Sequence, residues 1–164
     1  MAKKKSKANV GQILTLVAIL LGIVAVVMMF VSAIGVKDSD VTYTGLQVAF
    51  GFKEATILGG EVIVFNFSFM NLLTYVLATV GVVFAILGII GKGSKFASLI
   101  SAIAFVASGV FFFMTISFSI PNEDVSAIIN LKDSYVLGVG SIIGGIASII
   151  SGICCLANVV IENK

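Results

Sequence analysis

The chain of 164 residues lacks several residue types that enzyme sites depend on. It contains no histidine, arginine or tryptophan, one proline and two cysteines, and all ten basic residues are lysine. Without histidine, the commonest general base and metal ligand is missing, and no imidazole is available to activate a nucleophile. We therefore expect a protein that is not an enzyme and that carries no cofactor and no metal.

The two cysteines, Cys154 and Cys155, are adjacent. Neighbouring cysteines on a helix point in different directions and rarely bridge, so no disulfide framework is predicted. Two interpretations stay open: the pair fills space between helices as small side chains, or it is palmitoylated close to the membrane face.

Charge is absent from four long apolar runs, in a chain that is 59% hydrophobic with a mean hydropathy of +1.20. A spanning helix needs about 20 residues, and one lysine or aspartate at the bilayer centre would cost about 2.5–3.5 kcal/mol. The pattern predicts an all-α membrane protein, a four-transmembrane-helix bundle forming a single membrane domain over residues 1–164. The predicted spans are Gly11–Val36, Asn71–Gly91, Phe96–Ile120 and Tyr135–Ile161.

The charged residues that are present divide between the two ends of these runs. Seven of the ten lysines precede the first run, lie between the second and third, or end the chain, whereas seven of the eight acids follow the first or third run. The positive-inside rule then predicts a plasma-membrane protein with both termini and the turn 92–95 in the cytoplasm, and loops 37–70 and 121–134 outside. The topology anchors would be Lys3, Lys4, Lys5, Lys7, Lys92 and Lys95.

The first run has an alternative interpretation. A lysine-rich start followed by an apolar stretch and Val31-Ser32-Ala33 resembles a cleavable signal peptide. The run exceeds the 7–15 apolar residues usual for such a peptide, which favours a retained helix. The same lysines adjoin a spanning helix, so they are expected to face anionic lipid and not nucleic acid.

The first outside loop predicts a β-hairpin. Val41–Phe52 and Glu61–Phe69 are rich in aromatic and β-branched residues, the second with a period of two, and Gly59-Gly60 supplies a turn between them. We expect its aromatic positions to form an interface, with the row from Phe65 to Phe69 at the membrane surface. The interface candidates are Tyr43, Phe50, Phe65 and Phe67.

The second outside loop is short. Pro121 is expected to end the third helix, and Asn122 to cap a short interfacial helix with Val125, Ile128 and Ile129 on one face.

Small residues recur along every predicted span, most regularly in the fourth. Small side chains every four residues let two helix backbones approach closely in lipid. We expect this ridge to serve packing within the bundle, or else to bind a partner or a second copy. Its members are Gly140, Gly144, Ser148 and Gly152.

Four helices with cytoplasmic ends, a large β-rich first loop and a small second one resemble the claudin-like tetraspan proteins. Gly45-Leu46-Gln47 stands about where that family has a Gly-Leu-Trp element. The resemblance implies a shared fold plan and a habit of lateral assembly. The chain lacks the family's tryptophans and its pair of loop cysteines, so paracellular sealing is not implied. The Ile-, Phe- and Lys-rich composition is typical of coding from an AT-rich bacterial genome. The chain also resembles small multi-pass proteins of Gram-positive bacteria.

These observations favour a non-catalytic role: a structural, assembly or accessory subunit that binds a membrane protein partner, or itself, through lateral helix packing and its outer loop. The alternative is a small oligomeric channel, transporter or holin-like pore. Proton relays and ion sites are normally built from ionisable residues inside the membrane, and the four runs contain none.

Overall fold

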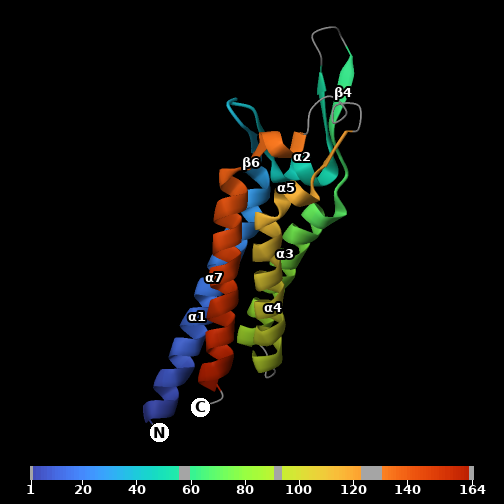
Figure 1. The fold of residues 1–164 in the computed structure, drawn as a ribbon. Helices are drawn as coiled ribbons and strands as arrows, with labels where there is room; N and C mark the ends of the chain where they lie inside the picture. The colour runs from blue at the N-terminus through green and yellow to red at the C-terminus, as the bar shows by residue number, and fades with distance from the viewer. Residues whose placement is uncertain (1, 56–59, 91–93, 123–130, 163–164) are drawn as a thin grey trace.

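The computed structural model describes residues 2–55, 60–90, 94–122 and 131–162 and is mostly helical. Four long helices run side by side (Figure 1). They are α1 (Ala2–Val27), α3 (Phe69–Ile90), α4 (Ser94–Phe113) and α7 (Val139–Glu162). Each contacts two others, in the order α1, α3, α4, α7 and back to α1, so the four close into a bundle.

All four helices are long and apolar enough to cross a membrane, over Val10–Phe30, Phe69–Ile90, Lys95–Phe113 and Val139–Ile161. This fits the predicted tetraspan topology. On α7 the outward side chains are large, such as Ile142, Ile146 and Ile153, whereas Gly144 and Ser148 point inward and are buried. Lipid tails are as apolar as these side chains, so close packing of the small inner residues must hold the helices together.

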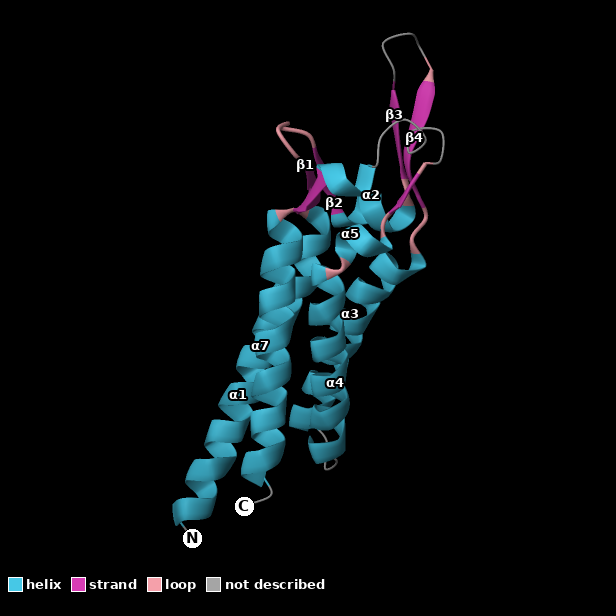
Figure 2. Ribbon diagram, viewed as in Figure 1, coloured by secondary structure: helices cyan, strands magenta, loops and turns pink. Residues whose placement is uncertain are grey.

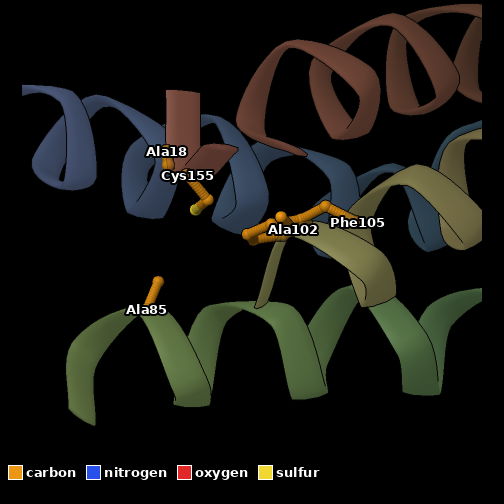
Figure 3. Close-up of a cluster of buried hydrophobic side chains, with 5 residues drawn as sticks. All are labelled: Ala18, Ala85, Ala102, Phe105 and Cys155. Atoms are coloured by element: carbon orange, nitrogen blue, oxygen red, sulfur yellow. The ribbon is translucent and has the colours of Figure 1, made fainter. Parts of the chain in front are cut away.

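Two phenylalanine rings of α4 fill notches, the gaps that glycines leave on neighbouring helices. Phe105 is fully buried, and its ring lies where side chains at Gly22 of α1 and Gly81 of α3 would be. Phe112, two turns further along α4, occupies the corresponding space beside Gly144 of α7. This seven-residue repeat of ring and notch gives the bundle its knobs-into-holes packing. Figure 3 shows Phe105 among Ala18, Ala85, Ala102 and Cys155.

A cap lies at the end of the bundle opposite the two chain termini (Figures 1 and 2). It comprises the described residues within 31–68 and 119–138 and holds two antiparallel three-stranded sheets. The first sheet has the order β2 (Thr42–Thr44), β1 (Ser32–Val36), β6 (Tyr135–Leu137), and the second the order β3 (Phe52–Ala55), β4 (Glu61–Asn66), β5 (Ile120–Pro121). Each sheet thus takes one strand from the described residues within 119–138.

The first span is shorter than predicted. After α1, one 3₁₀ turn, η1 (Met28–Phe30), ends the helix, and Ser32–Val36 is the central strand β1 instead of helix. The same correction applies at Tyr135–Leu137, predicted as helix and observed as β6. The physical reason is pairing: Ile34 lies opposite Leu137 and Gly35 opposite Thr42, so buried backbone groups are satisfied across strands. A short apolar run cannot reveal this, because buried strands and helices have similar composition.

The predicted strand Val41–Phe52 is also wrong over its middle. Within this range Thr42–Thr44 is strand, a six-residue helix, α2 (Gly45–Phe50), follows, and strand resumes only at Phe52, the first residue of β3. A capping box starts this helix: the Gln47 backbone N donates to Thr44 Oγ1 at 3.3 Å, and the Thr44 backbone N donates to Gln47 Oε1 at 2.8 Å. The Glu61–Phe69 strand is real as far as Asn66, after which α3 begins at Phe69. Of the predicted turn, Gly59 lies outside the described residues.

The third run ends earlier than predicted. Helix α4 stops at Phe113, a short helix α5 (Thr115–Phe118) follows, and Ile120–Pro121 forms β5. Met114 between the helices has φ −94° and ψ 7°, outside helical geometry. Before the fourth span, a 3₁₀ turn, η2 (Leu131–Ser134), precedes β6. The predicted interfacial helix with Val125, Ile128 and Ile129 lies outside the described residues.

Candidate interaction surface in the cap

The cap has a small aromatic core of its own. Tyr43 and Phe65 meet edge to face with ring centroids 5.0 Å apart, and Phe65 lies 5.7 Å from Tyr135. Ile34 and Val48 complete this cluster. It joins β1, β2, β4 and β6, so both sheets share one core. Such aromatic pairs stabilise by about 0.5–1.5 kcal/mol beyond the area they bury.

Two of the four predicted interface residues therefore lie inside the cap. Tyr43 is 8% exposed and Phe65 is 1% exposed, so Phe65 does not lie at the surface as predicted from the alternation. The alternation fails because the strand ends at Asn66 and the β3–β4 register shifts between Phe52 and Lys53. Tyr135 and Ile34 were missed as core residues because both were assigned to spans.

The tyrosines of this core are held in their neutral form. Burial raises the pKa of the Tyr43 phenol, and the carboxylate of Glu54 raises it further. Burial also raises the pKa of Tyr135, with Tyr43 adding to the effect. Removing either phenolic proton would place a charge in a core that is mostly apolar.

Polar side chains fasten the cap to the bundle. Ser141 Oγ donates to the carbonyl of Ala33 at 3.0 Å, which ties α7 to β1. Ser68 Oγ donates to Phe118 O at 2.6 Å, and Asn71 Nδ2 donates to Thr115 O at 3.3 Å, which ties the start of α3 to α5. The buried Oδ1 atom of Asn71 has no hydrogen-bond partner among the described residues.

The other two predicted interface residues are exposed. Phe50, at the end of α2, is 56% exposed, and Phe67, just after β4, is 51% exposed. Their ring centroids lie 6.4 Å apart, so they form a pair on the outside of the cap.

The β3–β4 hairpin projects beyond the rest of the cap (Figure 1). Val62 and Ile63 are both exposed although they point to opposite faces of β4. Lys53 Nζ lies 3.4 Å from Glu61 Oε2, and both side chains are exposed. Among the residues that the structure describes, β3 is an edge strand of the second sheet and pairs with β4 on one side.

The small-residue ridge of α7 faces inward. A side chain at Gly144 would meet the Phe112 ring 2.7 Å away, and one at Gly152 would meet Val106 at the same distance. Gly140 instead lies against the carbonyl of Ser32, and Ser148 is fully buried. In this structure the ridge packs within the chain, and a role toward a second chain would require those contacts to open.

The lysine anchors lie away from the cap. Lys3, Lys4, Lys5 and Lys7 are in the first turns of α1, and Lys95 is exposed near the start of α4. Both positions are at the end of the bundle that carries the termini (Figure 1). Lys92 lies outside the described residues.

The adjacent cysteines differ in environment. Cys155 is fully buried with its sulfur 3.4 Å from Ser101 Oγ, whereas Cys154 is partly exposed. Among the described residues, no three His, Cys, Asp or Glu side chains gather where they could hold a metal ion. No family model, curated protein or solved structure matches this chain.

Proposed function

We propose that this chain is a bacterial multi-pass plasma-membrane protein with cytoplasmic termini and an extracellular cap, acting as a non-catalytic accessory or assembly subunit. The observation that carries the proposal is the contrast between its two surfaces. Around the four helices the exposed side chains are mainly large and apolar, as Leu20, Ile86 and Ile146 are. The hairpin, in contrast, offers a strand edge and mixed apolar and charged side chains.

The hairpin is suited to strand addition by a partner. Among the described residues, β5 pairs with β4 only at Phe65 and Asn66, so the outer part of β3 and β4 is a two-stranded ribbon, and such a ribbon alone is marginally stable in water. An unpaired edge strand offers backbone donors and acceptors to another strand, a mode used widely in peptide recognition. Val62 and Ile63 would add apolar contacts on the two faces.

Charge favours a different protein over a second copy at this edge. Two copies of β3 can pair as antiparallel strands about a two-fold axis perpendicular to the sheet. The same residues then point to the same side of the sheet in both copies, so odd-numbered residues lie opposite odd-numbered ones and even-numbered opposite even-numbered. The two registers centred on the charged pair then place Lys53 opposite Lys53 or Glu54 opposite Glu54. Like charges directly opposite destabilise a strand pair. A partner with complementary charges avoids that cost.

A photo-crosslinking residue at Ile63 tests this proposal in native membranes. A matched control carries the same residue at Ile146, which is exposed in the middle of α7. We expect a stoichiometric protein adduct at Ile63 that is absent at Ile146. Adducts to copies of the chain alone, together with solute flux in proteoliposomes, would replace the accessory role with an oligomeric pore.

The orientation has its own test. With Cys154 and Cys155 replaced by serine, the chain has no other thiol. A Lys53→Cys variant should then react with a membrane-impermeant maleimide in intact cells, whereas Lys95→Cys should react only after lysis. The reverse pattern would contradict the assigned orientation.

A further inference from the structure

Along the axis of the bundle, the exposed pair Phe50–Phe67 lies where the four helices meet the cap. Phe67 lies in the short connection between β4, which ends at Asn66, and α3, which begins at Phe69. Extended chain rises about 3.3 Å per residue, so Phe67 can lie at most about 7 Å beyond the first residue of the span. The polar interfacial layer on each side of a hydrocarbon core is about 5–7 Å thick.

The backbone fixes Phe50 near the same height. The Ser68 backbone N donates to Ala49 O at 2.9 Å, so the end of α2 is bound to the start of α3. Gly51 follows with φ 89°, a conformation that residues other than glycine rarely adopt, and a β-carbon added there would lie 3.0 Å from the carbonyl oxygen of Phe65. This turn directs the chain away into β3 and leaves the Phe50 ring beside Phe67.

Exposed apolar side chains also begin α3, close to Phe67 in the chain. Phe69 is 59% exposed and Met70 is 45% exposed at the first turn of α3, directly below Phe67. The exposed pair is thus next to the exposed first turn of α3, so an apolar environment around that turn is within reach of Phe67 and Phe50. Val62, five residues before Phe67 near the start of β4, can lie up to about 17 Å from it along the strand, which exceeds the thickness of the interfacial layer.

We propose that Phe50 and Phe67 insert together into the interfacial layer of the outer leaflet, so lipid and not a protein partner covers this pair. The inference rests on the proposed membrane location. It adds that the surface of the cap has two parts with different surroundings. The aromatic base of the hairpin contacts lipid, and the outer part of β3 and β4 stays in water for recognition. Ring insertion on one side of α3 also fixes how the hairpin is tilted against the membrane.

The absence of tryptophan makes this directly measurable. The full chain carrying Phe67→Trp or Phe50→Trp is reconstituted into phosphatidylcholine–phosphatidylglycerol vesicles whose acyl chains are brominated either near the headgroup or near the chain end. Val62→Trp serves as the aqueous reference and Ile146→Trp as the mid-membrane reference. Melting temperatures in detergent identify any variant that has lost its fold, and the second phenylalanine position then stands in for it.

We expect the tryptophans at 50 and 67 to emit at shorter wavelength than the one at 62. They should lose more emission to the shallow bromines than to the deep ones, with the reverse order at 146. Emission at 50 and 67 that matches position 62, without quenching, overturns the inference, and so does stronger quenching by the deep bromines. If the tryptophan at position 146 is not quenched either, the proposed membrane location itself is wrong. This outcome distinguishes failure of the membrane location from failure of the insertion of Phe50 and Phe67.

Discussion

Replacing Phe105 by alanine is the sharpest test of how this bundle is held together. The ring is fully buried and fills the notches at Gly22 and Gly81, so it joins α4 to both α1 and α3. In water a buried Phe→Ala change costs about 3–5 kcal/mol, from lost transfer and from the cavity left behind. The transfer part, about 1.5–3 kcal/mol for a phenylalanine, is largely lost here, because the unfolded ring would still sit in lipid.

The remaining packing loss is about 2 kcal/mol, the difference between the total cost and the transfer part. It can be measured by titrating unfolding with sodium dodecyl sulfate in mixed micelles. Phe96→Ala is the matched control, because Phe96 lies on the same helix and is 72% exposed. We expect the control to change the free energy of unfolding by less than about 0.5 kcal/mol, as surface substitutions usually do.

A second substitution tests the notch itself. Gly81→Ala alone should destabilise the bundle, because its new methyl would lie 2.8 Å from the Phe105 ring. In the Phe105→Ala background the same methyl enters the space the ring has left, so the double variant should be more stable than Phe105→Ala alone. If Phe105→Ala matches Phe96→Ala, or if the two changes at 105 and 81 add without coupling, the ring-and-notch account is wrong.

Three further predictions concern other parts of the molecule. Gly144→Ala should cost about 1–3 kcal/mol of unfolding free energy by pressing on Phe112, whereas Ile143→Phe, which adds volume on the exposed side of α7, should leave the detergent titration unchanged. Because the Tyr43 pKa is raised in the folded cap, the contribution of Tyr43 to cap stability should be fully present below the ordinary tyrosine pKa of about 10 and be lost as the pH rises through the folded value. Near-ultraviolet circular dichroism would show this loss, and Tyr43→Phe should weaken it. Asn71→Leu should change the melting temperature less than Asn71→Ala, since it removes an unpaired buried oxygen while filling the space.

The four helices could be predicted from the sequence because lipid imposes a local rule. A spanning segment must be predominantly apolar and free of charge at its centre, and that requirement is visible one residue at a time. The spacing of Gly144, Ser148 and similar residues also indicated which side of each helix carries the small side chains. Each of these signals depends only on neighbours within the same helix.

The cap could be predicted only in outline, because its strands depend on distant partners. Ser32–Val36 is strand because Tyr135–Leu137 pairs with it, and neither segment alone distinguishes that outcome from one more helical turn. The burial of Phe65 and the exposure of Phe67 depended on where β4 ends, which the alternating pattern does not mark. One local signal was missed, since Thr44 and Gln47 stand three residues apart as a capping box requires.

The order of the first sheet has a consequence for biogenesis. Its central strand β1 pairs with β6, and the partner of Val36 is Tyr135, which is synthesised 99 residues later. At about 5–20 residues per second, that interval lasts about 5–20 seconds. Throughout it, two further helices must cross the membrane while one edge of β1 stays open and competent to pair with a foreign strand. The first sheet can therefore be completed only after the third span has been inserted and synthesis has reached β6. A nascent chain that stalls before β6 exposes an unpaired strand edge on that side of the membrane.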